Sequence, residues 1–235
     1  MTSVTVLTPN HSGKRTHAID RITPHCVVGQ VTAENLGAWF KQPSTRASSN
    51  YGIDKDGRVG LYVEEKNRSW CSSSNANDQR AVTIECASDT KEPYTMSGIV
   101  YDTLIRLCAD ICRRNGKKKL LWIADKGEAL MYVPAADEML LTVHRWFANK
   151  SCPGDWLYSR LGDLAQKVTA ALNPTPTEDG AFSDVPASAW YADDVRWVAK
   201  MGIMSGYGDG RFGPTDPLTR AQFATILRRV LEKTT

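Results

Sequence analysis

Short apolar runs recur along the first 172 residues of the chain and predict β-strands. They lie at residues 22–29, 81–87 and 119–124. Residues 50–63 carry β-rich arms on either side of an Asp-Gly pair, a pattern that predicts a hairpin with a tight turn.

Segments with helical spacing of apolar residues separate these runs. Residues 31–40 form one such segment, with Thr32 as a candidate N-cap, and residues 98–116 form another, with Gly116 as a stop signal. A further helical segment at 155–173 ends the region. Because strands alternate with helices, the pattern predicts an α/β domain with a mixed central β-sheet flanked by helices.

The stretch NPTPTEDG, residues 173–180, combines prolines, acidic residues and a glycine, and predicts an extended linker. It divides the chain into a domain over 1–172 and a small all-α module over 181–235. Two helical segments are expected in the module, and Thr219 with Gln222 fits a capping box. A unit of this size is marginal for an independent core, so we expect it to pack on the larger domain, on copies of itself or on a partner.

Composition narrows the classes of function. The formal net charge of +3 is mild, and the one basic cluster, residues 113–119, lies at a predicted helix end, where cations suit the helix dipole. Nucleic-acid binding is therefore not expected. No apolar run approaches the roughly 20 residues of a membrane span, so no membrane insertion is expected. The first residues lack the apolar stretch of a secretory signal, which favours synthesis in the bacterial cytoplasm and release by another route.

The candidate chemistry centres on HRWFANKSCPGDW, where His144, Lys150 and Cys152 lie within nine positions. A catalytic zinc ion takes about three protein ligands, and His25, His144 and Cys152 could supply them. Alternatives remain open at this point. Cys152 could be a nucleophile with His144 as its base, and His25 could be a hydrogen-bonded core histidine. His11 and His17 are rival histidines.

The order of several short motifs resembles a known family. His25, the GIDKDGRV turn, the TIE run ending at Glu85, His144 and the KSCP of residues 150–153 follow one another as in the zinc-dependent N-acetylmuramoyl-L-alanine amidases of the type-2 class. The resemblance covers nearly all of residues 15–170. It implies a groove at one end of the sheet holding one Zn²⁺, and an enzyme that cleaves the amide between N-acetylmuramic acid and L-alanine of peptidoglycan.

The resemblance also implies roles for single residues. His25, His144 and Cys152 would bind the zinc ion, Glu85 would move the proton of the attacking water, and Lys150 would face the oxyanion that develops on the carbonyl. Asn50 stands where many relatives carry a histidine before the tyrosine, and we expect it to line the groove and contact substrate.

The tail resembles a second family, the surface-layer homology module, through FSDV, a tryptophan, GYGDG and TRAQ in order. Such modules bind secondary cell-wall polysaccharide. The resemblance implies that Trp190 stacks on a sugar and that Arg220 meets an acid group, whereas a helix-core role is the alternative for Trp190. Relatives usually combine three modules and this chain has one, so a homotrimer is a possible assembly.

Together these features predict an endolysin of phage origin that is directed to the cell wall. A host autolysin with the same chemistry and a non-catalytic peptidoglycan-binding protein are the alternatives. Cys152 favours an enzyme, because non-catalytic relatives typically lack the third ligand.

Overall fold

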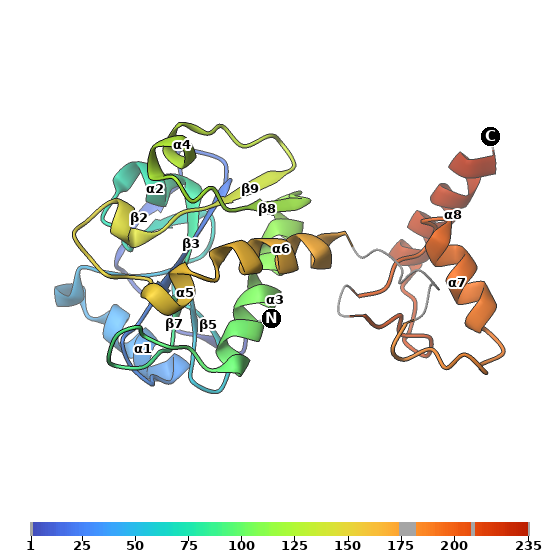
Figure 1. Ribbon diagram of the computed structural model, residues 1–235, viewed down its shortest axis with the longest axis horizontal. Coiled ribbons are helices and arrows are strands. Elements are labelled where there is room, and N and C mark those ends of the chain that lie inside the picture. The colour runs from blue at the N-terminus through green and yellow to red at the C-terminus, as the bar shows by residue number, and fades with distance from the viewer. Residues whose placement is uncertain (1, 174–181, 208–209, 235) are drawn as a thin grey trace. The chain divides into compact units, whose positions relative to one another are not determined.

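The computed structural model of the chain describes residues 2–173, 182–207 and 210–234 (Figure 1). The chain divides into two compact units, Met1–Thr169 and Ala170–Thr235. The predicted linker, residues 173–180, lies outside the described residues except for Asn173.

The larger unit is built on a seven-stranded sheet with the order β1-β5-β4-β7-β3-β9-β8. Only β4 and β5 pair antiparallel, and the other neighbours are parallel, so the sheet is mixed as predicted. Strands β2 and β6 form a separate antiparallel pair. The bounds are Val4–Thr5 (β1), His11–Lys14 (β2), Arg21–Cys26 (β3), Tyr51–Ile53 (β4), Val59–Leu61 (β5), Asn67–Ser69 (β6), Ala81–Cys86 (β7), Lys119–Leu121 (β8) and Glu138–Leu141 (β9).

The strands that the sequence predicted are present, each somewhat shorter than its apolar run. The hairpin is β4 and β5, and Gly57 in its turn has a φ of 78°, which favours glycine. Four strands were not predicted, namely β1, β2, β6 and β9, because they are short or partly polar.

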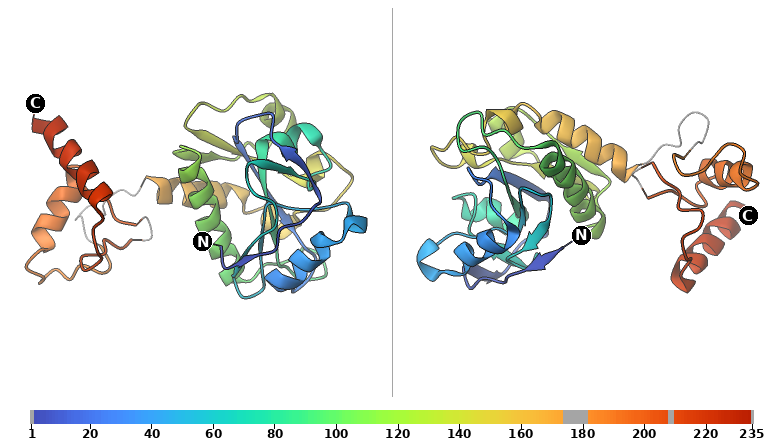
Figure 2. Two further views of the ribbon diagram at one scale, coloured as in Figure 1. Left: turned by 180° about the vertical axis from the view of Figure 1, so that it is seen from behind. Right: turned by 90° about the horizontal axis from the view of Figure 1, so that it is seen from below.

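Helices cover both faces of the sheet. In the two views of Figure 2, α1 lies on one side, and α3 and α6 lie together on the other. The hydroxyl of Tyr101 in α3 donates to Asp163 of α6 at 2.8 Å, which joins these two helices. The helices of this unit are Ala33–Lys41 (α1), Asn75–Arg80 (α2), Gly98–Arg114 (α3), Lys126–Met131 (α4), Asp155–Tyr158 (α5) and Leu161–Leu172 (α6), with 3₁₀ turns at Pro43–Thr45 and His144–Trp146.

Local sequence signals account for the helix ends. The hydroxyl of Thr32 accepts the N–H of Asn35 and caps α1. Helix α3 ends before Gly116, whose φ is 68°. The single helix expected over 155–173 is divided into α5 and α6, because the chain leaves the helix between Tyr158 and Leu161.

The pairing of β3, β7 and β4 positions the chemistry. His25 pairs with Glu85 across β3 and β7, and Glu85 pairs with Gly52 across β7 and β4. Residues paired in this way project to the same face of a sheet. A Cβ placed on Gly52 would lie 2.8 Å from the Leu36 side chain of α1, so glycine is required here for the close approach of that helix.

The smaller unit holds the two predicted helices, α7 (Ala192–Lys200) and α8 (Arg220–Thr234). The apolar spacing of residues 187–202 predicts the first of these helices, and α7 begins later than that pattern, at Ala192. The capping box is present, since the backbone N–H of Gln222 donates to the Thr219 hydroxyl at 3.2 Å and the N–H of Thr219 donates to the Gln222 side chain at 2.8 Å.

A small apolar cluster supports this unit. It contains Val185, Ala192 and Val195, with the rings of Phe182 and Phe212 packed against it. Much of α8 remains uncovered, because Phe223 is 57% and Leu231 is 58% exposed. Within the described residues, none of the helices combines the length and apolar character that crossing a membrane requires.

Candidate metal centre

Three elements of the larger unit bring His25, His144 and Cys152 together. His25 lies near the end of β3, His144 opens the 3₁₀ turn after β9, and Cys152 lies in the loop before α5. Their ligand atoms are all within 4.8 Å of one another. The Sγ of Cys152 lies 3.3 Å from Nδ1 of His25, and the two imidazole rings meet edge-on with centroids 5.1 Å apart.

The donor set fits a soft divalent cation. Two imidazoles and a thiol are the ligand types that zinc prefers, and three of them leave a coordination position open. His25 is 1% exposed, and its buried Nε2 has no hydrogen-bond partner among the described residues. An unpaired buried nitrogen is unfavourable, and a coordinated cation or an ordered water would remove the deficit.

Both histidines are held in the neutral form that binds metals. Burial and the neighbouring His144 lower the pKa of His25 well below its usual value. Burial and the positive charge of Lys150 lower the pKa of His144. The Nε2 of His144 lies 2.9 Å from the hydroxyl of Ser73, which orients the ring.

The surroundings of Cys152 disfavour a free thiol nucleophile. Hydrogen bonding to Cys26, burial and the carboxylate of Glu85 all raise the pKa of the Cys152 thiol. A nucleophilic cysteine requires the opposite shift, because the thiolate is the reactive form. The thiol of Cys152 is also within hydrogen-bonding distance of His25, whereas His144 was the base expected for a nucleophilic cysteine.

Glu85 lies beside this cluster. Its Oε1 accepts from the thiol of Cys71 at 3.7 Å, while its Oε2 is buried and has no partner among the described residues. Burial raises the pKa of Glu85 to about 7, and the hydrogen bond from Cys71 opposes this shift. A carboxyl group with this pKa can exchange a proton near neutral pH.

Lys150 and His144 line the same cavity, which has a volume of about 510 Å³. Lys150 is exposed, and two further cations, Arg46 and Arg68, lie along the same walls. The acidic residue of the lining, Asp78, is 3% exposed, and its carboxylate accepts the backbone N–H groups of neighbouring residues. The cavity therefore presents mainly positive charge to a ligand.

The expected substrate contact of Asn50 does not fit its position. Asn50 is fully buried, and it is not among the residues that line the cavity. Its Oδ1 accepts from Arg15 at 2.9 Å and from the N–H of Thr83 at 3.1 Å, and its Nδ2 donates to the carbonyl of Val63 at 3.1 Å. Asn50 thus joins three segments of the fold, and sequence reasoning erred because it could not show this burial.

The rival histidines lie elsewhere. His11 belongs to β2, where its Nδ1 accepts the N–H of Gly13 at 2.9 Å, and His17 is exposed. Neither belongs to a cluster of possible metal ligands within the described residues.

Sequence reasoning missed Cys71. The structure places this half-buried residue in a second group of possible ligands, together with His25 and Glu85. Nothing in the local sequence around Cys71 resembles a motif, and only the packing of the segment after β6 against β7 brings it to the site.

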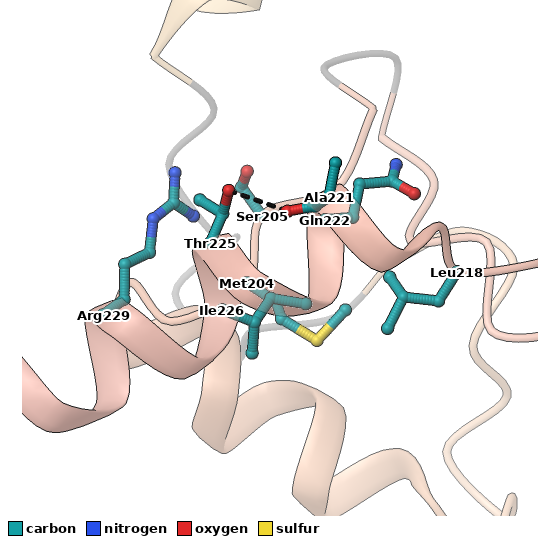
Figure 3. Close-up of a pocket in the computed structure, with 8 residues that line it drawn as sticks. All are labelled: Met204, Ser205, Leu218, Ala221, Gln222, Thr225, Ile226 and Arg229. Carbon is teal, nitrogen blue, oxygen red and sulfur yellow. Dashed lines mark hydrogen bonds between the residues drawn. The ribbon is translucent and has the colours of Figure 1, made fainter.

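In the smaller unit, Trp190 and Arg220 are both exposed. Trp190 is 88% exposed, which excludes the helix-core alternative, and Arg220 opens α8. A separate pocket of this unit, drawn in Figure 3, has a volume of about 340 Å³. Within its lining, the Thr225 hydroxyl donates to the carbonyl of Ala221 at 3.0 Å. Its lining consists of Met204, Ser205, Leu218, Ala221, Gln222, Thr225, Ile226 and Arg229.

Comparisons with known proteins agree with this architecture. Residues 15–155 match the N-acetylmuramoyl-L-alanine amidase family, and residues 181–224 match the S-layer homology domain. The first match covers more than half of the chain. The chain therefore belongs to the N-acetylmuramoyl-L-alanine amidase family, a zinc-dependent family, and carries a C-terminal S-layer homology domain.

A solved structure of a hydrolase shares the fold of the larger unit. A Staphylococcus aureus hydrolase, AmiA, solved in complex with its ligand, is 12% identical and superposes with a TM-score of 0.51 over 73% of this chain and 84% of that one. The N-acetylmuramoyl-L-alanine amidase LysC from Clostridium intestinale is 16% identical, with a TM-score of 0.46 over 73% of this chain and 99% of that one.

Curated relatives match over shorter stretches. An S-layer protein of Bacillus licheniformis is 33% identical over 67 residues, which are 28% of this chain and 8% of that protein. A cellulosome-anchoring protein of Acetivibrio thermocellus is 40% identical over 52 residues, 22% of this chain and 12% of that protein. The chain thus spans about a tenth of the length of these relatives.

The raised pKa of Glu85 predicts a pH dependence of stability in the metal-free protein. Its carboxyl holds a proton more tightly in the folded state, with a pKa of about 7, than in the unfolded state, with a pKa near 4.5. The contribution of Glu85 to the free energy of unfolding should therefore decline as the pH rises from about 4.5 to 7. The free energy of unfolding can be measured by urea titration of chelator-treated protein at several pH values in this range. It should fall more steeply with pH in the wild type than in Glu85→Gln.

Glu128→Gln, at an exposed position of α4, is the matched control and should keep the wild-type slope. If Glu85→Gln and the wild type showed the same pH dependence, Glu85 would not be desolvated in the folded protein.

Proposed function

We propose that the larger unit hydrolyses the amide bond between N-acetylmuramic acid and L-alanine in bacterial peptidoglycan, and that the smaller unit holds the enzyme at the cell wall. The observation that carries this proposal is the convergence of His25, His144 and Cys152 at one end of the sheet, in a domain of the amidase family. His144 also lines a cavity of about 510 Å³, a volume in the range of ligand-binding sites.

His25, His144 and Cys152 would hold one Zn²⁺. When bound, the ion supplies a Lewis acid that polarises the scissile carbonyl and lowers the pKa of water. The neutral state of both imidazoles suits this role, and the Ser73 hydroxyl fixes the ring of His144.

Glu85 would act as the general base and then as the general acid. Its pKa of about 7 allows it to accept a proton from water at neutral pH and to deliver the proton to the leaving amine. Its Oε2 has no partner among the described residues, which leaves that oxygen available for proton transfer.

Lys150 would stabilise the negative charge that develops on the carbonyl oxygen. The exposed Lys150 lines the same cavity as His144. A fixed positive charge at this position acts mainly on the transition state, where the oxyanion forms.

The reaction can be tested by mass spectrometry of digested cell walls. The wild-type protein should create new L-alanine N-termini and no new reducing sugar ends. Cys152→Ser and chelator treatment should abolish this product, because each removes the cation, and Lys150→Met should lower kcat by about 100-fold.

Lys41→Met, at an exposed position of α1, is the matched control and should retain full activity. New reducing ends would identify a glycosidase, and undiminished cleavage by Cys152→Ser would exclude the zinc mechanism. If intact walls bound the protein without any cleavage, the non-catalytic alternative would be correct.

The neighbouring genes would distinguish a phage enzyme from a host enzyme. A neighbouring gene for a membrane-permeabilising lysis protein would identify a phage endolysin that accumulates in the host cytoplasm before release. A location among genes of wall synthesis would identify a host autolysin with the same reaction.

The S-layer homology domain would bind secondary cell-wall polysaccharide through Trp190 and Arg220. Both side chains are exposed, and a tryptophan face with a guanidinium group suits a sugar that carries an acid group. Trp190→Ala and Arg220→Ala should each weaken binding to purified walls by about tenfold in a co-sedimentation assay.

Trp39→Ala is the control for loss of an exposed tryptophan, since Trp39 is 52% exposed on α1 of the larger unit. Unchanged wall binding by both module variants would show that the domain contacts the wall through other residues, such as those of the pocket in Figure 3.

We further propose that three chains associate through this domain. Apolar side chains of α8, including Phe223, Leu227 and Leu231, are each about half exposed, and association would remove them from water. Sedimentation equilibrium should then show a mass of three chains that falls on dilution, and Leu227→Glu should sediment as a single chain. A wild-type protein that sediments as one chain at every concentration would contradict the trimer.

A further inference from the structure

The thiol of Cys71 lies beside the metal centre but does not belong to the proposed ligand set. Cys71 follows β6, and its Sγ lies 3.7 Å from Oε1 of Glu85. Together with His25, these residues form a second group whose ligand atoms are all within 4.8 Å of one another. His25 is the residue that the two groups share.

The spacing within this second group suits a tetrahedral cation. With metal–ligand distances of about 2.0–2.3 Å, two tetrahedral ligands are separated by about 3.3–3.8 Å. The distance between Cys71 and Glu85 falls in this range, as does the 3.3 Å between Cys152 and His25 in the first group.

A second observation points to a ligand at this position. Nε2 of His25 and Oε2 of Glu85 are both buried and lack hydrogen-bond partners among the described residues. Buried polar atoms are nearly always paired with protein, water or an ion. Two unpaired atoms on neighbouring strands, next to a thiol, are the arrangement that a coordinated cation would complete.

We propose that Cys71, Glu85 and His25 form a second, alternative position for a soft divalent cation such as Zn²⁺ or Cd²⁺. A thiolate, an imidazole and a carboxylate together favour such ions over Mg²⁺ or Ca²⁺. Because a neutral imidazole has one unprotonated nitrogen, His25 serves one ion at a time, and the two positions exclude each other.

This second position has a consequence for the proposed reaction. An ion bound there takes the carboxylate of Glu85 as a ligand, so Glu85 can no longer accept a proton from water. The ion also loses His144 and Cys152 as ligands. The position is therefore a non-productive one, which competes with the proposed catalytic position for the same cation.

Binding of Cd²⁺ to the full-length, metal-free protein tests this proposal without reference to amidase activity. A Cd²⁺–thiolate bond gives a charge-transfer absorption in the ultraviolet, so the titration reports both stoichiometry and the presence of a sulfur ligand. Cys152→Ser disables the first group. We expect it still to bind one Cd²⁺ with a thiolate signal, now from Cys71.

Adding Cys71→Ser to Cys152→Ser should abolish the thiolate signal and weaken Cd²⁺ binding by at least about tenfold. Serine can still donate a hydrogen bond to Glu85, so this change removes the soft ligand and little else. Cys112→Ala combined with Cys152→Ser is the matched control, since Cys112 is a buried cysteine of α3, and it should behave as Cys152→Ser alone.

Two results would overturn the proposal. One is a Cys152→Ser protein, folded by circular dichroism, that binds Cd²⁺ without a thiolate signal. The other is a signal that persists in the protein with both serines, because another thiol such as Cys26 would then be the ligand. Should Cys152→Ser not fold, Cys152→Ala provides the same test.

Failure here is distinguishable from failure of the proposed function. The wild type could release L-alanine N-termini while Cys152→Ser shows no thiolate signal. This pair of results would refute only the second cation position. A wild-type protein without amidase activity would leave the Cd²⁺ result standing.

Discussion

The parallel pairing of β3 with β7 is the constraint on which the rest of the site depends. This register sets His25 beside Glu85, on one face of the sheet and close to the ends of both strands. A shift of one residue would turn one of the two side chains to the opposite face, toward α3. His144 and Cys152 follow β9 in the chain. The 3₁₀ turn after β9 and the loop before α5 place them next to His25.

The buried side chains of His25 and Glu85 are electrostatically unfavourable where they lie. Burial pushes His25 toward its neutral form and Glu85 toward its protonated form, and it leaves one polar atom of each without a partner. Such an arrangement destabilises the metal-free fold and favours any cation that satisfies these atoms. The groups that destabilise the site are therefore the groups that proton transfer and metal binding require, as is common where pKa values are strongly shifted.

The S-layer homology domain has only a small hydrophobic core. Its core consists of a few side chains around Val195, and the carboxylate of Asp184 holds the loop before α8 by accepting the N–H groups of Phe212 and Gly213 at 2.7 and 2.8 Å. A unit this small buries too little apolar surface to enclose all of its own hydrophobic residues. The exposed apolar side chains of α8 are the result.

The mixed α/β class, the cap of α1 at Thr32, the end of α3 before Gly116 and the hairpin turn at Gly57 could all be predicted from the amino-acid sequence, because each depends on local periodicity or backbone conformation. The ordered motifs also identified the family, and they named the three residues that the fold brings together. The burial of Asn50 and the position of Cys71 beside Glu85 became visible only in the folded chain. Both positions depend on packing between segments that are distant in sequence. A local sequence pattern does not show which side chains the folded sheet buries or brings into contact.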